Sequence, residues 1–131
     1  MNLETYKKYV KKFDKHLKGN LEEGRLKMLT AKDKKNLPEL YSTEKDKNPK
    51  VWVKYFGIMR ADGWYWLITE YDGKDGMFGA VRSPMTHGRW ELGYISLREL
   101  NSLFPQVERD MYFKPTSLSK AKAEIDKNYE K

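Results

Sequence analysis

Apolar and polar residues alternate with a period of two along much of the middle of the chain. Such alternation is typical of β-strands, because successive side chains of a strand point to opposite faces of the sheet. It predicts strands over residues 51–56, 64–71, 77–82 and 89–96. The segment 108–114 is either a fifth short strand or an extended return.

The same alternation predicts which side chains share a face. In the first strand, Val51, Val53 and Tyr55 fall on one side. In the second strand, Glu70 falls on the same side as two tryptophans and an isoleucine. Both faces of the second strand carry bulky side chains, so we expect neither to be simply exposed to water.

Elsewhere, apolar residues recur at spacings of three and four, which is the period of an amphipathic helix. A first helix is expected over residues 2–18 and a last one through residues 121–129. Between them, Thr30 is placed to cap a short helix that Pro38 stops. Ser96 begins a capping-box pattern for another helix.

The turns between the strands are short, and the run DGKDG at residues 72–76 is a strong hairpin signal. The sequence therefore predicts an α+β fold with an antiparallel four- to five-stranded meander sheet. Helices are expected at both termini and after the fourth strand, covering one face of the sheet. The length of 131 residues suits one domain, which we place at residues 28–131. Residues 1–27 would form an N-terminal basic amphipathic helix and a link.

The composition excludes several classes of chemistry. The chain has no cysteine, which excludes disulfides, thiolate catalysis and cysteine-based zinc or iron-sulfur sites. No stretch approaches the roughly 20 apolar residues that span a bilayer, and the first residues lack the apolar run of a signal peptide. We therefore expect a soluble cytoplasmic protein with no membrane contact, no cofactor and no small-molecule substrate.

The formal net charge of +7 would attract a polyanion or an acidic protein surface at long range. Lysines concentrate at the two ends of the chain. On the first helix they are Lys7, Lys8, Lys11, Lys12, Lys15 and Lys18. These candidate binding residues form either a solvated polar face or a site for phosphate or a membrane surface.

The predicted sheet is also rich in aromatic residues. Proteins that bind single-stranded nucleic acid place aromatic side chains beside a basic groove. No RRM-type signature is present, and most of the aromatic residues are expected in the core. From this region the candidates for contact with nucleic acid or a protein partner are Arg60, Trp64, Arg82 and Arg89.

Four carboxylates could meet at one edge of the sheet, namely Glu70, Asp72, Asp75 and Glu91. Clustered carboxylates can hold Mg²⁺ or Ca²⁺, or act as an acid and a base. The alternative is turn chemistry, since a hairpin needs Asp-Gly in any case. If Glu70 is buried, it needs a partner such as Lys54 or Arg109. We keep Glu70, Asp72 and Asp75 as candidate binding residues and assign no catalytic residue or metal.

His87 is a further candidate because it lies in a loop, where functional residues concentrate. Ser83 and Thr86 are close to it in sequence, but no nucleophile-elbow motif surrounds either hydroxyl. In the run ERD at residues 108–110, Arg109 is expected to take part in a structural ion-pair network, with a phosphate clamp as the alternative.

A resemblance to a known family rests on four runs: LTAKDKKNLPELYSTEKDKNPKVWVKYF, WYWLITEYDGKDGMFGAV, ELGYISLREL and ERDMYFKPTSL. In this order they resemble a family of small proteins catalogued only as a domain of unknown function and carried by bacterial plasmids, phages and integrative elements. The resemblance covers residues 29–118 and implies a mobile-element setting, not a reaction. Residues 1–27, the insert MRADG and the loop SPMTHGR depart from the family pattern.

Three classes of function follow. The first is a non-enzymatic binding protein of a mobile genetic element that engages nucleic acid or a nucleoprotein complex through basic helices and exposed aromatics. The second is an inhibitor of a host defence effector, of the anti-CRISPR or anti-restriction type, that acts by protein-protein contact. The third is a small carboxylate-dependent enzyme, which we rank below the two binding classes.

Overall fold

The computed structural model of the chain describes residues 28–58, 63–103 and 106–129. The helix expected over residues 2–18 lies outside these ranges, as does the proposed N-terminal link. In the described part, every helix is too short or too polar to cross a membrane.

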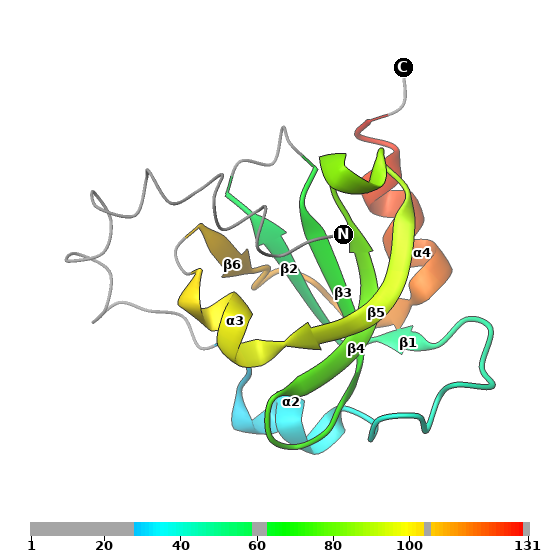
Figure 1. Cartoon of the computed structure of the whole chain (residues 1–131). Helices are drawn as coiled ribbons and strands as arrows, with labels where there is room; N and C mark the ends of the chain where they lie inside the picture. Colours follow the sequence, from blue (N-terminus) through cyan, green and yellow to red (C-terminus); the bar gives the residue numbers. More distant parts are fainter. Residues whose placement is uncertain (1–27, 59–62, 104–105, 130–131) are drawn as a thin grey trace.

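A five-stranded antiparallel sheet forms the centre of the fold (Figure 1). Its strands, in spatial order, are β5 (Trp90–Ser96), β4 (Gly76–Arg82), β3 (Tyr65–Tyr71), β2 (Val53–Gly57) and β6 (Val107–Arg109). The order from β2 to β5 confirms the predicted meander. The short strand β6 pairs with β2 at the edge opposite β5, where Gly57 faces Val107.

A second, two-stranded sheet pairs β1 (Lys50–Val51) with β7 (Thr116–Ser117). The prediction of one strand over residues 51–56 is therefore wrong, because the chain passes from one sheet to the other between Val51 and Val53. As a result, these two valines belong to different core clusters on opposite faces of the large sheet, and not to one shared face.

The helices of the described residues are α2 (Ala31–Asn36), α3 (Leu97–Ser102), α4 (Leu118–Asp126) and the short 3₁₀ helix η2 (Pro84–Thr86). Thr30, Ser96 and Ser117 cap the three α-helices, each accepting a backbone N–H with its hydroxyl. This confirms the caps predicted at Thr30 and Ser96. At Thr30 the capping box is reciprocal, since the Asp33 carboxylate accepts the Thr30 N–H at 2.8 Å.

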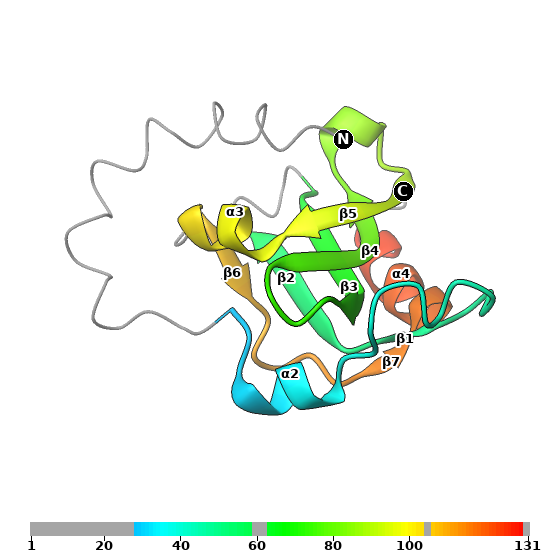
Figure 2. The same cartoon turned by 60° about the horizontal axis from the view of Figure 1, so that its bottom comes forward.

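At the centre of the sheet both faces are covered, so all seven residues of β3 are buried. One cluster joins the sheet to α3 and to residues 28–37. The other joins it to Leu118, Ala121 and Ile125 of α4. Accordingly, α3 and α4 lie on different sides of the sheet (Figures 1 and 2). The prediction that the helices cover one face is wrong, because α4 finds its apolar partners on the second face.

Strand β3 contains a β-bulge at Thr69. Ile68 and Glu70, two residues apart on β3, pair with adjacent residues of β4. A bulge shifts the alternation of side chains by one residue. Glu70 therefore lies on the α4 side of the sheet, and Tyr71 joins the cluster that holds the tryptophans. The prediction that Glu70 shares the face of the tryptophans is wrong for this reason.

An ion pair fastens strand β6 to helix α2. Both terminal nitrogens of Arg109 donate to the Asp33 carboxylate, with Nη2 at 2.9 Å from Oδ1. Arg109 thus forms a structural ion pair, although with a distant residue and not with its sequence neighbours. Its neighbour Asp110 pairs with Lys54 at 3.2 Å.

Replacing Asp33 with asparagine should lower the free energy of unfolding by about 2 kcal/mol at neutral pH, because Arg109 loses its carboxylate. Burial acts to raise the pKa of Asp33, but hydrogen bonds from Arg109 and Thr30 and the Arg109 charge outweigh burial and lower it below 3.8. A depressed folded-state pKa means that the stabilisation is present above pH 3.8 and is lost as the pH falls through the lower folded value.

Urea unfolding of the wild type and the Asp33→Asn variant, at neutral pH and well below pH 3.8, checks this expectation. The difference between the two proteins should shrink in acid. A difference of equal size at both pH values would contradict it.

Candidate binding groove

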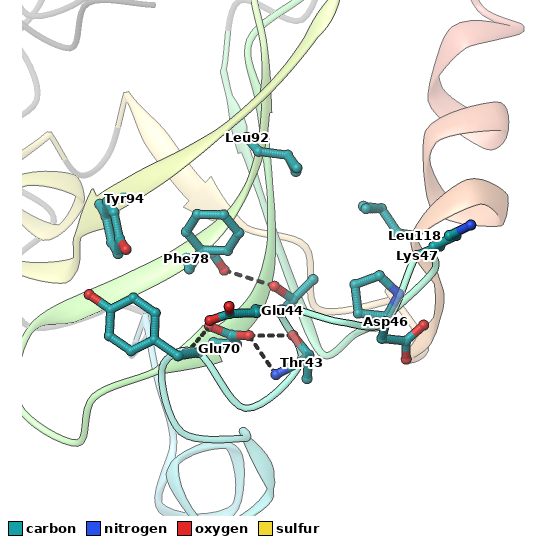
Figure 3. A pocket seen from close by; sticks show the side chains of 12 residues that line it. Thr43, Glu44, Asp46, Lys47, Glu70, Phe78, Leu92, Tyr94 and Leu118 are labelled. Atoms are coloured by element: carbon teal, nitrogen blue, oxygen red, sulfur yellow. Dashed lines mark hydrogen bonds between the residues drawn. The ribbon is translucent and has the colours of Figure 1, made fainter.

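The face of the sheet that α4 packs on is only partly covered. Helix α4 has nine residues, which makes it about 13 Å long. A groove of about 370 Å³ opens beyond its first residue, Leu118. Its lining comes from strands β3, β4 and β5 and from residues 41–49 (Figure 3). We call it the aromatic groove.

Aromatic rings form one wall of the groove. Phe78 and Tyr94 project from β4 and β5 on the same side, with ring centroids 5.2 Å apart (Figure 3). Tyr41 approaches the Tyr94 ring edge-on at 6.3 Å. Tyr41, Leu92 and Tyr94 are each more than 60% exposed. Large apolar side chains gathered in this way are unusual on a surface that contacts only water.

Glu70 lies at the base of the groove and is 3% exposed. Its Oε1 accepts the Tyr41 N–H at 2.7 Å, and its Oε2 accepts the Thr43 N–H at 2.9 Å and a hydrogen bond from the Thr43 hydroxyl. The expectation that Lys54 or Arg109 balances this carboxylate is wrong, because both basic residues pair elsewhere. Glu70 instead holds the segment 41–49 against the sheet.

Tyr41 adopts a left-handed backbone conformation, with φ of 70°. This conformation is uncommon for a residue with a side chain and costs on the order of 1 kcal/mol. The hydrogen bond from its N–H to Glu70 helps to offset that cost and directs the Tyr41 ring toward Tyr94. The buried carboxylate therefore also positions part of the aromatic wall.

Acidic side chains outnumber basic ones in the groove, with Glu44, Asp46 and Glu70 against Lys47. In the described residues, no Lys or Arg forms an ion pair with Glu44 or Glu70. A hydrogen bond with Tyr41 is the main cause that raises the pKa of the Tyr94 hydroxyl, and the nearby charges of Glu70 and Glu44 add to it. The groove is thus an acidic site on a basic chain.

The groove is continuous with the exposed edge of the sheet. Strand β5 occupies the end of the strand order, so within the described part of the chain its outer edge has no partner strand. Most of its seven residues are exposed or partly exposed. Leu92 and Tyr94 of this strand also line the groove. An edge strand can accept an additional strand from another chain through its free backbone groups.

Asp72 and Asp75 have the structural role in the turn that was one of the two interpretations of the acidic residues in the sequence. Asp72 accepts three backbone N–H groups of the turn that follows it, and its pKa is lowered mainly by these hydrogen bonds. Asp75 bonds the Ser96 hydroxyl and the Arg98 N–H, which ties the turn to the start of α3. Over the described ranges, no group of three acidic or histidine side chains could hold a metal ion. Turn chemistry therefore accounts for Asp72 and Asp75.

Among the described residues, the candidates Trp64, Arg82 and Arg89 do not line the groove. Trp64 is buried and stacks on Trp66 in the core. Arg82 is also buried, where Nε donates to the Gly88 carbonyl and lies 3.2 Å from Asp126. Arg89 is exposed. Candidates outside the described residues are Lys7, Lys8, Lys11, Lys12, Lys15, Lys18 and Arg60.

His87 is exposed and adopts a left-handed conformation at the end of η2. The nearby hydroxyls serve the turn itself. Ser83 Oγ accepts the Met85 N–H, and Thr86 Oγ1 donates to backbone carbonyls and accepts the Ser83 N–H. Both hydroxyls therefore stabilise the turn, and both residues are buried whereas His87 is exposed.

Of the sequence candidates that the structure describes, only Glu70 lines the aromatic groove. Four other residues of the groove, Tyr41, Phe78, Leu92 and Tyr94, were not predicted from the sequence as site residues. For Phe78, Leu92 and Tyr94 the sequence signal was weak, because an aromatic residue or a leucine in an alternating strand is equally typical of the core. The exposure of Leu92 and Tyr94 follows from the short length of α4 and from the position of β5 at the sheet edge.

Among the comparisons with known proteins, a match was found to a protein family. A family described as "Protein of unknown function (DUF2958)" matches residues 21–128 of the chain. This match includes the whole range over which the sequence resembles a domain of unknown function. The comparisons with curated proteins and with solved structures found no match.

Proposed function

Because the chain belongs to the DUF2958 family, whose function is unknown, its activity has to be argued from its own residues, and we propose that it is a non-enzymatic binding protein. The proposed contact is with a protein partner, through the aromatic groove and the neighbouring strand β5. The observation that supports this proposal is the exposure of Tyr41, Leu92 and Tyr94 around one groove beside β5, which is an edge strand in the described part of the chain.

Exposed aromatic and aliphatic side chains around a pocket are the usual anchors of protein interfaces, where a few residues carry most of the binding free energy. Burying apolar surface contributes about 25 cal/mol per Å². The edge of β5 adds main-chain donors and acceptors at the border of the same patch. Together they offer a partner both apolar contact and a strand to pair with.

Charge favours a protein over nucleic acid at this surface. Phosphate groups would meet Glu44, Asp46 and Glu70 with only Lys47 to attract them. We therefore favour the second class of function, an inhibitor of a host defence effector of the anti-CRISPR or anti-restriction type. A mobile-element setting for such an inhibitor is part of the proposal and rests on the resemblance in the sequence.

The net charge supports nucleic acid as a second candidate partner, at a different place on the chain. Residues 1–27 carry eight of the 26 Lys and Arg residues but only four of the 19 acidic residues. More than half of the net charge of +7 therefore belongs to this segment. Contact with nucleic acid would use these lysines and would weaken steeply with salt.

Capture of partners from host lysate by the full chain tests the proposed contact. We expect the double variant Leu92→Ser, Tyr94→Ser to recover at least about tenfold less partner protein after nuclease treatment, because an interface loses its apolar anchors. The matched control is the double variant Met111→Ser, Tyr112→Ser, which removes two exposed side chains, 59% and 94% exposed, outside the groove. Thermal unfolding should show both variants folded.

Two outcomes would contradict the proposal. The first is equal recovery of partner protein by the two double variants. The second is loss of all captured protein when nucleic acid is digested, which would instead support the lysine-rich segment as the contact.

A further inference from the structure

We infer that the aromatic groove receives the cationic side chain of an arginine or lysine, presented by an extended segment of the partner protein. This inference rests on the proposed function and specifies the chemistry of the partner. It follows from three features of the groove, namely its charge, its aromatic rings and its position beside β5.

The first feature is a pair of carboxylates, Glu70 and Glu44, that form no ion pair with any described Lys or Arg, although Lys47 also lines the groove. Glu70 is almost fully buried, and its three hydrogen-bond donors in the segment 41–49 are neutral groups. In the described residues it has no ion-pair partner, and neither has Glu44 at the rim. A positive charge entering the groove would interact favourably with both, and more strongly than in bulk water because the surroundings are largely apolar.

The second feature is the set of rings above this charge. Tyr94 lies at interplanar angles of 64° to Tyr41 and 67° to Phe78. Rings at these angles present π-faces in more than one direction around the opening. A guanidinium or ammonium group within about 6 Å of such a face is attracted to it, and partial burial strengthens that attraction. The long aliphatic stem of arginine or lysine would pack on Leu92.

The third feature selects the form of the partner. A strand added to the outer edge of β5 would point alternate side chains to the face that carries Leu92 and Tyr94. A long side chain on that face can turn back over Tyr94 into the groove. The volume of about 370 Å³ is at the small end for ligand pockets and suits one side chain better than a bulky ligand.

Two blocked five-residue peptides test the inference directly. One carries arginine at its centre between valines and threonines, and the other carries citrulline, which has the same shape without the charge. The readout is the NMR resonances of Tyr41, Phe78 and Tyr94 in the full chain during titration. We expect the arginine peptide to shift these resonances with at least about tenfold higher affinity than the citrulline peptide, and the difference to fall with added salt.

A pair of matched variants locates the charge that is recognised. Glu44→Gln should weaken binding of the arginine peptide several-fold, because it removes a rim carboxylate without changing the size of the side chain. Glu99→Gln, an exposed substitution on α3 outside the groove, should leave binding unchanged. Equal effects of the two variants would show that the peptide responds to overall charge, which would overturn the assignment.

Other results would also overturn it. Equal affinity for both peptides, or no shift with either, removes the cationic side chain as the occupant. Shifts of the same resonances with a single-stranded oligonucleotide would point to nucleic acid, and shifts with protein concentration alone would point to a second copy of the chain. The lysate capture tests the apolar contact at Leu92 and Tyr94 independently of the peptide titration. The proposed protein contact can therefore stand when the preference for a cationic side chain fails.

Discussion

Replacing Gly79 with alanine is expected to destabilise the domain by about 4 kcal/mol or more, which places it among the largest effects of a single substitution. A Cβ atom on Gly79 would lie 1.9 Å from the Leu67 carbonyl oxygen and 3.0 Å from the Ile68 Cα. Both neighbours are backbone atoms of β3, next to the bulge at Thr69. Relief of the clash therefore requires β3 and β4 to separate, and no side chain can move aside in their place.

Gly93 provides the matched control for this prediction. It faces Gly79 directly across the β4–β5 ladder, but a Cβ atom there would meet nothing within 4 Å. Gly93→Ala should therefore change the free energy of unfolding by less than about 0.5 kcal/mol. Urea unfolding followed by circular dichroism compares the two variants. A cost below about 1 kcal/mol for Gly79→Ala would contradict the close approach of the two strands.

Glu70→Gln should lower the free energy of unfolding by about 2 to 3 kcal/mol, although the side chain keeps its shape. Each carboxylate oxygen of Glu70 accepts a backbone N–H, one from Tyr41 and one from Thr43. Glutamine replaces one of these oxygens with an NH₂ group, so one buried donor would face another donor. The segment 41–49 would lose part of its attachment to the sheet.

The measurement has two parts. Urea unfolding reports the loss of free energy of unfolding for the whole domain. Amide hydrogen exchange reports the weaker attachment of the segment 41–49, which should appear as faster exchange at Tyr41 and Thr43. Glu44→Gln is the control, because Glu44 is an exposed residue of the same segment. If Glu70→Gln and Glu44→Gln behaved alike in both measurements, Glu70 would not be the attachment point.

Much of the fold was predictable because its signals are local. Alternating residues and short turns predict the meander from β2 to β5, and single hydroxyl residues predict the caps at Thr30 and Ser96. The errors have non-local causes. The bulge at Thr69 adds one residue to one strand, and this reverses the faces of Glu70 and Tyr71 without any change in composition. The division of residues 51–56 depends on a partner strand about 65 residues away, at Thr116.

The groove was less predictable than the sheet. Glu70 could be selected from the sequence because a carboxylate in an apolar strand needs a polar partner. Its partners include the backbone N–H groups of Tyr41 and Thr43, and these could not be predicted because every residue type except proline carries a backbone N–H. Leu92 and Tyr94 look like core residues in the sequence. They are exposed because α4 covers only part of the face and because β5 is the last strand of the sheet.

The residues that would meet a partner are not the residues that hold the sheet together. Glu44, Leu92 and Tyr94 are exposed, whereas Glu70 is buried at the base of the groove and Gly79 permits the close approach of β3 and β4. Substitutions at the three exposed positions should therefore accumulate with little loss of folding stability. For the proposed inhibitor, such a division would let recognition of a changing target evolve while the scaffold stays constant. The same positions are where a library aimed at new targets should be built.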